Sequence, residues 1–272
     1  MKYLYRYRKF NNNTLKEIFK GELYFSSPRE LNDPFDCMPI VECDGTVEEF
    51  RELYKDIRKK YHYNNLSDEE IDKRVLEEFD ESKITDKELL SEFINQNILQ
   101  SRDQVYVCCF SETNNNAAMY AHYSDNNTGV CLEYNLKALS SQFEIIDKVN
   151  YGIERPIIKF IDGFKMGEKE YSKRFLLTKS KSWEYENEYR IIAFPILTDE
   201  GKLLDSIIPS SSEHRIIKLQ PETLTGIILG YKISEENEAM LIDRIRVEHL
   251  DINIYKAIPS TADYKMEINQ ID

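Results

Sequence analysis

Three helix-start signals follow one another in a chain whose other segments are mostly strand-like. In a capping box, a Ser or Thr at the helix N-cap and a Glu three residues later bond each other's backbone amides. The pattern occurs at Thr46/Glu49, Ser67/Glu70 and Thr85/Glu88. Each box precedes an apolar stripe with helical spacing. We therefore expect a helical insertion at about 44–103 within a fold that is otherwise rich in strands.

The segments on either side of this block have the short apolar or alternating patterns of strands. The strand-like segments are "YLYRYR" at 3–8, "ELYFSS" at 22–27, "QVYVCCFS" at 104–111, "GVCLEY" at 129–134, "EIIDKVNYG" at 144–152, "YENEYRIIAF" at 185–194, "HRIIKL" at 214–219, "TGIILGY" at 225–231 and "INIYKA" at 252–257. At 272 residues the chain is long for one domain and short for two. The pattern predicts a single α+β domain over 1–272, with a mixed, mostly antiparallel sheet as its core.

Shorter signals place the remaining helices. Thr14 is expected to cap a short helix that Gly21 ends. Further helices are expected at 116–123 and 234–248. The last of these lies between two strand-like segments, so it predicts a βαβ crossover with a parallel strand pair near the C-terminus.

Charge and cysteine content limit the function classes. The chain has 36 Lys and Arg against 49 Asp and Glu, a net charge of -13 that repels phosphate backbones at long range. The five cysteines have no C-x-x-C spacing, which favours reduced thiols over disulfides or a zinc site. No apolar run of 18 residues or signal-peptide core is present, so we expect a cytoplasmic protein that does not enter a membrane.

The stretch "KSWEYENEYR" at 181–190 holds the most concentrated polar pattern. If the whole stretch is a strand, a period of two places Glu184, Glu186, Glu188 and Arg190 on one face, with neighbouring carboxylates about 6.6 Å apart. A solvated strand face is one interpretation. The apolar "IIAF" that follows favours another, in which the glutamates lie near the core and serve a ligand.

Three further polar stretches have both a structural and a functional interpretation. "LYFSSPRELNDPFDC" at 23–37 is either a well-built turn or a loop that presents Ser26, Asn32 or Asp36 to a ligand. Ser111 ends a strand without the base that a nucleophile needs, so a hydrogen-bonding role is favoured. His122 lies among tyrosines and is more typical of a packing residue than of a catalytic base.

Several of these stretches together resemble the bacterial family called Domain of Unknown Function 2971. The resemblance covers roughly residues 3–195 and depends most on "LNDPFD" and the W-x-Y-E-x-E-Y-R pattern. Family members usually have Met-Trp where this chain has Met119-Tyr120. The other matching stretches are "LYRYR", "CCFSE" and "MYAHYSDNNTGVCLEY".

A second resemblance is to the R-S-E arrangement of ADP-ribosyltransferase folds. It implies NAD as a substrate, with Glu188 as the catalytic carboxylate and Glu186 on the acceptor side. It also implies that an early-strand arginine and a strand-end serine hold NAD in a pocket. The residues implied for that pocket are Arg6 or Arg8 and Ser111 or Ser26, and we expect Tyr24 and His122 to line the same pocket.

Three functional hypotheses follow. The first is an NAD-consuming transferase or glycohydrolase, acting as a toxin or anti-phage effector on a protein or nucleic-acid acceptor. The second is a metal-dependent nuclease or hydrolase built on the carboxylates of Asp33, Asp36, Glu133, Glu186 and Glu188. The third is a non-catalytic sensing or interaction module whose motifs are structural.

Overall fold

The computed structural model describes residues 2–42, 45–63, 65–79, 90–92, 94–96, 102, 105–162, 168–193 and 215–271. The chain divides into two compact units. The first, which we call the sheet unit, comprises 1–32, 104–151 and 180–272. The second, the helical unit, comprises 33–103 and 152–179. The single domain expected over 1–272, with a helical insertion at about 44–103, stays a prediction.

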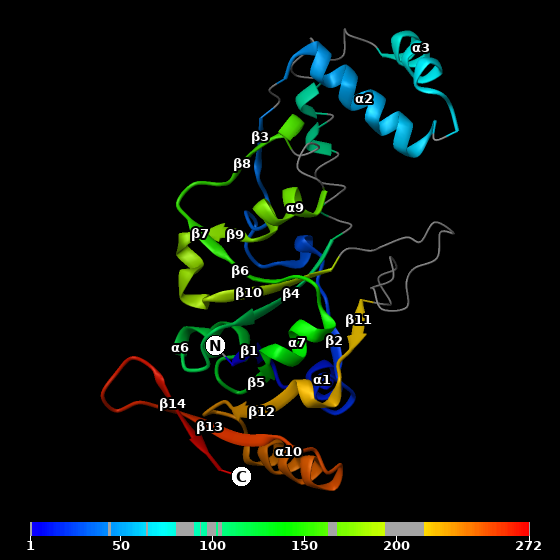
Figure 1. Ribbon diagram of the computed structural model, residues 1–272. Coiled ribbons are helices and arrows are strands. Elements are labelled where there is room, and N and C mark those ends of the chain that lie inside the picture. The colour runs from blue at the N-terminus through cyan, green and yellow to red at the C-terminus, as the bar shows by residue number, and fades with distance from the viewer. Residues whose placement is uncertain are drawn as a thin grey trace. The chain divides into compact units, whose positions relative to one another are not determined.

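An eight-stranded sheet forms the sheet unit, with strand order β14-β13-β12-β5-β1-β4-β10-β6 (Figure 1). Every neighbouring pair is antiparallel except β12 and β13, which are parallel. The α+β class with a mixed, mostly antiparallel sheet is confirmed. The strands are β1 (Tyr3–Arg8), β4 (Tyr106–Ser111), β5 (Val130–Asn135), β6 (Ile146–Lys148), β10 (Glu188–Ala193), β12 (Leu224–Leu229), β13 (Asn253–Pro259) and β14 (Met266–Gln270).

Helices cover both faces of this sheet. One face, which we call the α1 face, packs against apolar side chains of α1 (Asn12–Lys20), α7 (Leu136–Gln142) and α10 (Glu235–Val247). The other, the α6 face, packs Tyr7, Cys131 and Ile228 against Met119 and Tyr120 of α6 (Ala117–Tyr123). Because successive side chains of a strand point to opposite faces, each strand residue is assigned to one face by its position.

Helix α1 begins three residues earlier than expected. The prediction that Thr14 caps it is wrong, because Asn11 is the N-cap and its side chain accepts a hydrogen bond from the Thr14 amide at 3.0 Å. The Thr14 hydroxyl instead donates to the Lys9 carbonyl at 2.6 Å. Gly21 ends the helix in the left-handed region, at φ 64°, as expected.

Several other elements of the sheet unit lie where the sequence signals place them. Helices α6 and α10 lie within the expected ranges, and the β12–α10–β13 crossover gives the parallel pair that was predicted. Strand β2 (Glu22–Tyr24) pairs with β11 (Ile216–Lys218). Three short 3₁₀ helices complete this unit, η1 (Pro28–Glu30), η2 (Lys181–Glu186) and η3 (Pro221–Thr223). Strands β7 (Asn150–Gly152) and β9 (Thr178–Ser180) lie where the chain passes between the units.

The helical unit contains α2 (Val47–Tyr61), α3 (Asp68–Glu78), α9 (Glu168–Leu176) and the parallel pair β3 (Ile40–Glu42) and β8 (Ile157–Lys159). The capping boxes at Thr46 and Ser67 start α2 and α3 as predicted. The third box, at Thr85 and Glu88, lies outside the described residues. The apolar stripe of α2 is buried through Phe50, which stacks on Phe160 at 6.3 Å.

Two cysteines lie in the core of the sheet unit. Cys108 is on the α1 face and Cys131 on the α6 face, and both are almost fully buried. Burial raises the pKa of the Cys108 thiol to about 11 and that of Cys131 well above its ordinary value. Since the thiolate is the reactive form, both thiols should be inert in the folded protein.

We predict that iodoacetamide at pH 8 leaves Cys108 and Cys131 unmodified in the folded protein and alkylates both after denaturation, as measured by peptide mass spectrometry. Their low ionised fraction and their burial both slow the reaction of the thiols with iodoacetamide. Alkylation of Cys108 in the folded protein at the rate of a free thiol would contradict the packing of the α1 face.

Candidate functional site

The segment 181–190 is not one strand. The expected alternation over its whole length is wrong, because η2 occupies Lys181–Glu186 and β10 begins only at Glu188. Asn187 joins the two elements with φ 44°, in the left-handed region that Asn tolerates better than most residues. Glu184 is exposed, whereas Glu186 and Glu188 are each only 3% exposed. The two buried glutamates therefore come from different elements.

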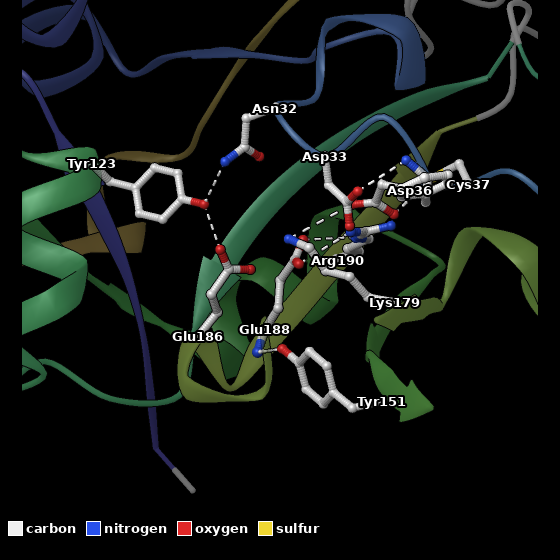
Figure 2. Close-up of polar contacts among 11 residues, drawn as sticks. Asn32, Asp33, Asp36, Cys37, Tyr123, Tyr151, Lys179, Glu186, Glu188 and Arg190 are labelled. Carbon is white, nitrogen blue, oxygen red and sulfur yellow. Dashed lines mark hydrogen bonds and ion pairs between the residues drawn. The ribbon is translucent and has the colours of Figure 1, made fainter. Parts of the chain in front are cut away.

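Glu188 forms a two-pronged ion pair with Arg190. The Arg190 Nε donates to Glu188 Oε1 at 2.7 Å, and Nη2 donates to Oε2 at 3.1 Å. The two residues are two positions apart on β10 and share a face, as the strand period predicts. The Arg190 side chain is fully buried. The Glu188 amide also donates to the Tyr151 hydroxyl at 2.8 Å. Glu188 is thus fixed from both its carboxylate and its backbone (Figure 2).

Glu186 has a different environment. Its carboxylate accepts a hydrogen bond from the Tyr123 hydroxyl, at the C-terminal end of α6. That hydroxyl in turn accepts from the Asn32 side-chain amide at 3.0 Å. Figure 2 shows Tyr123 lying between Asn32 and Glu186. Because Asn32 is exposed and Tyr123 half-buried, this chain of bonds leads from solvent to a buried carboxylate.

Helix α6 and η2 are joined by side chains that also form an aromatic surface. Asn116 caps α6 by accepting from the Ala118 amide at 2.9 Å, and its amide group donates to the Tyr185 carbonyl at 2.9 Å. The Tyr185 hydroxyl lies 3.0 Å from His122 Nδ1, and its ring lies 6.1 Å from that of Trp183. His122 is exposed and the other two rings are half-buried. We call His122, Tyr185 and Trp183 the aromatic surface.

The structure places Ser111, rather than Ser26, beside the glutamates. Ser111 pairs with Glu188 across β4 and β10, so both lie on the α6 face. Its hydroxyl donates to the Glu186 carbonyl at 2.6 Å, a hydrogen bond that joins η2 to β4. Ser26 instead forms an isolated backbone bridge with Val107. The hydrogen-bonding role that was favoured for Ser111 agrees with this arrangement.

Arg6 and Arg8 lie on the opposite side of the sheet. Both alternate with Tyr5 and Tyr7 along β1 and face α1, where Glu17 lies. Arg6 Nη1 donates to Glu17 Oε1 at 2.7 Å, and Arg8 Nε lies 3.2 Å from Oε2. The Tyr134 hydroxyl donates to the same carboxylate at 2.6 Å. We call these four residues the Glu17 cluster.

Tyr24, also expected in the pocket, contributes its carbonyl to Arg6 at 3.3 Å, while its hydroxyl donates to Glu30 at 3.3 Å. The structure thus brings Ser111, Glu186, Glu188 and His122 to one region of the α6 face and its edge, and does not bring Arg6 or Arg8 there. The R-S-E convergence that the ADP-ribosyltransferase resemblance implies is not formed, and that resemblance is not supported.

The remaining residues of the polar turn at 23–37 behave as an Asx turn predicts. Asp33 accepts a hydrogen bond from the Phe35 amide at 2.9 Å. Asp36, in the helical unit, is buried and lies 3.6 Å from the Lys179 ammonium. Among the residues that the structure describes, no group of three or more His, Cys, Asp or Glu side chains is arranged to hold a metal ion.

Sequence reasoning missed Glu17, Tyr123 and Tyr151. Glu17 looks like any other polar residue of a short amphipathic helix, and only the pairing of β1 with its neighbours brings two arginines to it. Tyr123 and Tyr151 belong to stretches that were noted, but a tyrosine's bonding partner depends on contacts between distant segments.

In the comparison with known families, residues 119–191 match the family described as Protein of unknown function (DUF2971). The expected family resemblance is confirmed over these residues. The matched DUF2971 segment begins in α6 and ends in β10, so it contains Tyr123, Glu186 and Glu188. Comparison with curated proteins and with solved structures gives no match. In the described part of the chain, no helix is both long and apolar enough to span a membrane.

We predict that Glu17→Gln lowers the free energy of unfolding by about 3–5 kcal/mol, because it leaves two arginines without their carboxylate. Urea denaturation followed by circular dichroism measures the change. Tyr134→Phe is the matched control, since it removes one hydrogen bond to the same carboxylate and should cost about 1.5–3 kcal/mol. Equal losses in the two variants would show that charge pairing does not hold the Glu17 cluster together.

Proposed function

We propose that the region around Glu186 binds NAD or a related nucleotide and assists the breaking of its N-glycosidic bond, as a transferase or a glycohydrolase. The observation that carries this proposal is a buried carboxylate connected to solvent through Tyr123 and Asn32. On this proposal the acceptor is water or a nucleophilic group of a protein or nucleic acid. On this proposal the protein acts as a toxin or an anti-phage effector that consumes NAD.

The chemistry requires a carboxylate close to the sugar. Breaking an N-glycosidic bond builds positive charge on the ribose carbon, and a negative group held in a poorly hydrated place stabilises that charge in the transition state. Removal from water strengthens the interaction, because fewer solvent dipoles screen it. The 3% exposure of Glu186 fits this requirement.

Glu186 is a better candidate for this role than Glu188. The charge of Glu188 is offset by the guanidinium of Arg190 through two hydrogen bonds, which leaves less of its field for a developing cation. Glu186 accepts a hydrogen bond from the neutral hydroxyl of Tyr123, which orients its carboxylate. We assign Glu188 the role of holding β10 and its neighbours in place.

The aromatic surface supports the nucleotide class of ligand. Rings of Tyr, Trp and His offer flat apolar faces on which an adenine or nicotinamide ring can stack. Tyr185 immediately precedes Glu186 and His122 immediately precedes Tyr123, so the stacking surface and the carboxylate are built from the same two elements, η2 and α6.

A second candidate function is a non-catalytic sensing or interaction module. It is favoured by the hydrogen bonds that use Ser111 and Glu188 within the fold, since these groups hold elements together. In that case the aromatic surface would bind a ligand without chemical change. Binding and turnover must therefore be measured separately.

We predict that Glu186→Gln lowers the rate of nicotinamide release from NAD at least 100-fold without changing the unfolding transition. The reason is the loss of one negative charge at the reacting carbon. Liquid chromatography with mass spectrometry measures the nicotinamide. Glu184→Gln is the matched control, because Glu184 lies on the same 3₁₀ helix but is exposed, and its rate should equal that of the wild type.

No nicotinamide release by the wild type, with water or with protein and nucleic-acid acceptors, would reject the enzymatic proposal. Binding of NAD without turnover would leave the sensing module as the function of this region.

We predict further that Tyr185→Leu raises the Kd for ADP-ribose about tenfold, because one stacking ring contributes on the order of 1–3 kcal/mol to binding. Isothermal titration calorimetry measures the Kd. Tyr231→Leu, which removes an exposed tyrosine after β12, should leave it unchanged. An unchanged Kd in Tyr185→Leu would exclude the aromatic surface as the nucleotide contact.

A further inference from the structure

A second buried carboxylate lies on the α6 face, on β5. Glu133 is 7% exposed, and its Oε1 accepts a hydrogen bond from the Thr225 hydroxyl at 2.9 Å. Within the described part of the chain, no arginine, lysine or histidine forms an ion pair with it. Buried carboxylates are normally paired with a cation, because burial without one costs free energy. A positively charged partner would therefore stabilise the Glu133 carboxylate.

Three tyrosines surround this carboxylate. Tyr5 pairs with Glu133 across β1 and β5, and Tyr3, two positions before it, points to the same face. A Cβ atom at Gly226 would lie 3.2 Å from the Tyr255 ring and 3.3 Å from Glu133 Oε1. The ring and the carboxylate thus both pack close to the backbone of Gly226, where a side chain would crowd them. All three rings are half-buried.

Tyr5 and Tyr255 remain neutral in this environment. Burial, followed by the negative charge of Glu133, raises the pKa of Tyr5 and of Tyr255. Neutral phenol rings carry negative charge on their faces and attract cations. Phenol rings next to one carboxylate form a surface that favours a positive group over water.

The chain itself provides an example of this preference. The Lys2 ammonium lies 4.9 Å from the centroid of the Tyr3 ring. Lys2 is exposed, and among the described contacts it forms no ion pair with Glu133. Its ammonium therefore lies at the edge of the group formed by Glu133 and the three tyrosines.

We propose that Glu133, Tyr3, Tyr5 and Tyr255 bind a small organic molecule that carries a primary ammonium group. A primary ammonium has N–H donors for the carboxylate, which a quaternary ammonium lacks, and it can lie against the ring faces at the same time. The net charge of -13 raises the local concentration of such cations. This binding uses none of the residues assigned to the NAD proposal, so either can fail without the other.

The test is calorimetric titration of the folded protein with 1,4-diaminobutane at fixed ionic strength, with 1-butanol as the uncharged comparison. We expect binding of the diamine only, and at least tenfold weaker binding by Glu133→Gln, which retains an oxygen for Thr225. Glu222→Gln is the matched control. It removes the same charge from an exposed position on η3 and should bind as the wild type does. Lys2→Met should bind two- to fivefold more tightly, because it removes a competing ammonium.

Equal weakening by Glu133→Gln and Glu222→Gln would overturn the proposal, since it would show attraction by net charge alone. Wild-type affinity in Glu133→Gln would overturn it as well. If circular dichroism shows that Glu133→Gln does not fold, Tyr255→Leu decides the question, because its ring is half-buried and packs against Gly226 next to the carboxylate. The proposal then requires at least threefold weaker binding in that variant, and unchanged affinity rejects it.

Discussion

The alternation of side chains along β1 decides which polar residues of the sheet unit can meet. Strand β1 lies between β5 and β4 in the eight-stranded sheet, so its two faces contact both layers of helices. Arg6 and Arg8 face α1, where the Glu17 carboxylate and the Tyr134 hydroxyl bind them. Tyr5 faces the other way, towards Ser111 and Glu133. A backbone of this geometry cannot bring Arg6 and Glu188 to one ligand without unpairing the strand.

The same register aligns the polar residues of the α6 face. Glu133, Tyr5, Ser111 and Glu188 occupy paired positions on the adjacent strands β5, β1, β4 and β10. With neighbouring strands about 4.8 Å apart, the two carboxylates are separated by roughly 14 Å. Each lies in its own electrostatic environment, since Glu188 has Arg190 while Glu133 has a hydroxyl and aromatic rings. Two carboxylates at equivalent depth in one sheet are therefore suited to different tasks.

Signals that act within a few residues were enough to predict much of this fold. The boxes at Thr46 and Ser67 begin helices because the bonds that define them are local, and Gly21 ends α1 for the same reason. The prediction of one strand over 181–190 was wrong because an alternating sequence of Glu and aromatic residues does not exclude a 3₁₀ helix. The left-handed turn at Asn187 also leaves no periodic signal in the sequence.

The position of each candidate residue on one or the other face depended on register, which pairs residues far apart in the chain. Strand period alone correctly placed Glu188 and Arg190 together. It could not show that Ser111 rather than Ser26 lies across from Glu188, or that Tyr123 reaches Glu186 from α6.

The junction of η2 and β10 explains why two glutamates so close in sequence differ in chemical character. A continuous strand would have placed Glu186 beside Glu188, and the Arg190 guanidinium would then have offset both charges. The turn at Asn187 instead directs Glu186 towards Tyr123 of α6 and leaves Glu188 with Arg190. One carboxylate thereby contacts a residue of its own strand, while the other contacts helix α6 at the edge of the aromatic surface. That separation, made by a single residue in the left-handed conformation, gives two glutamates that are two positions apart in sequence different hydrogen-bonding partners.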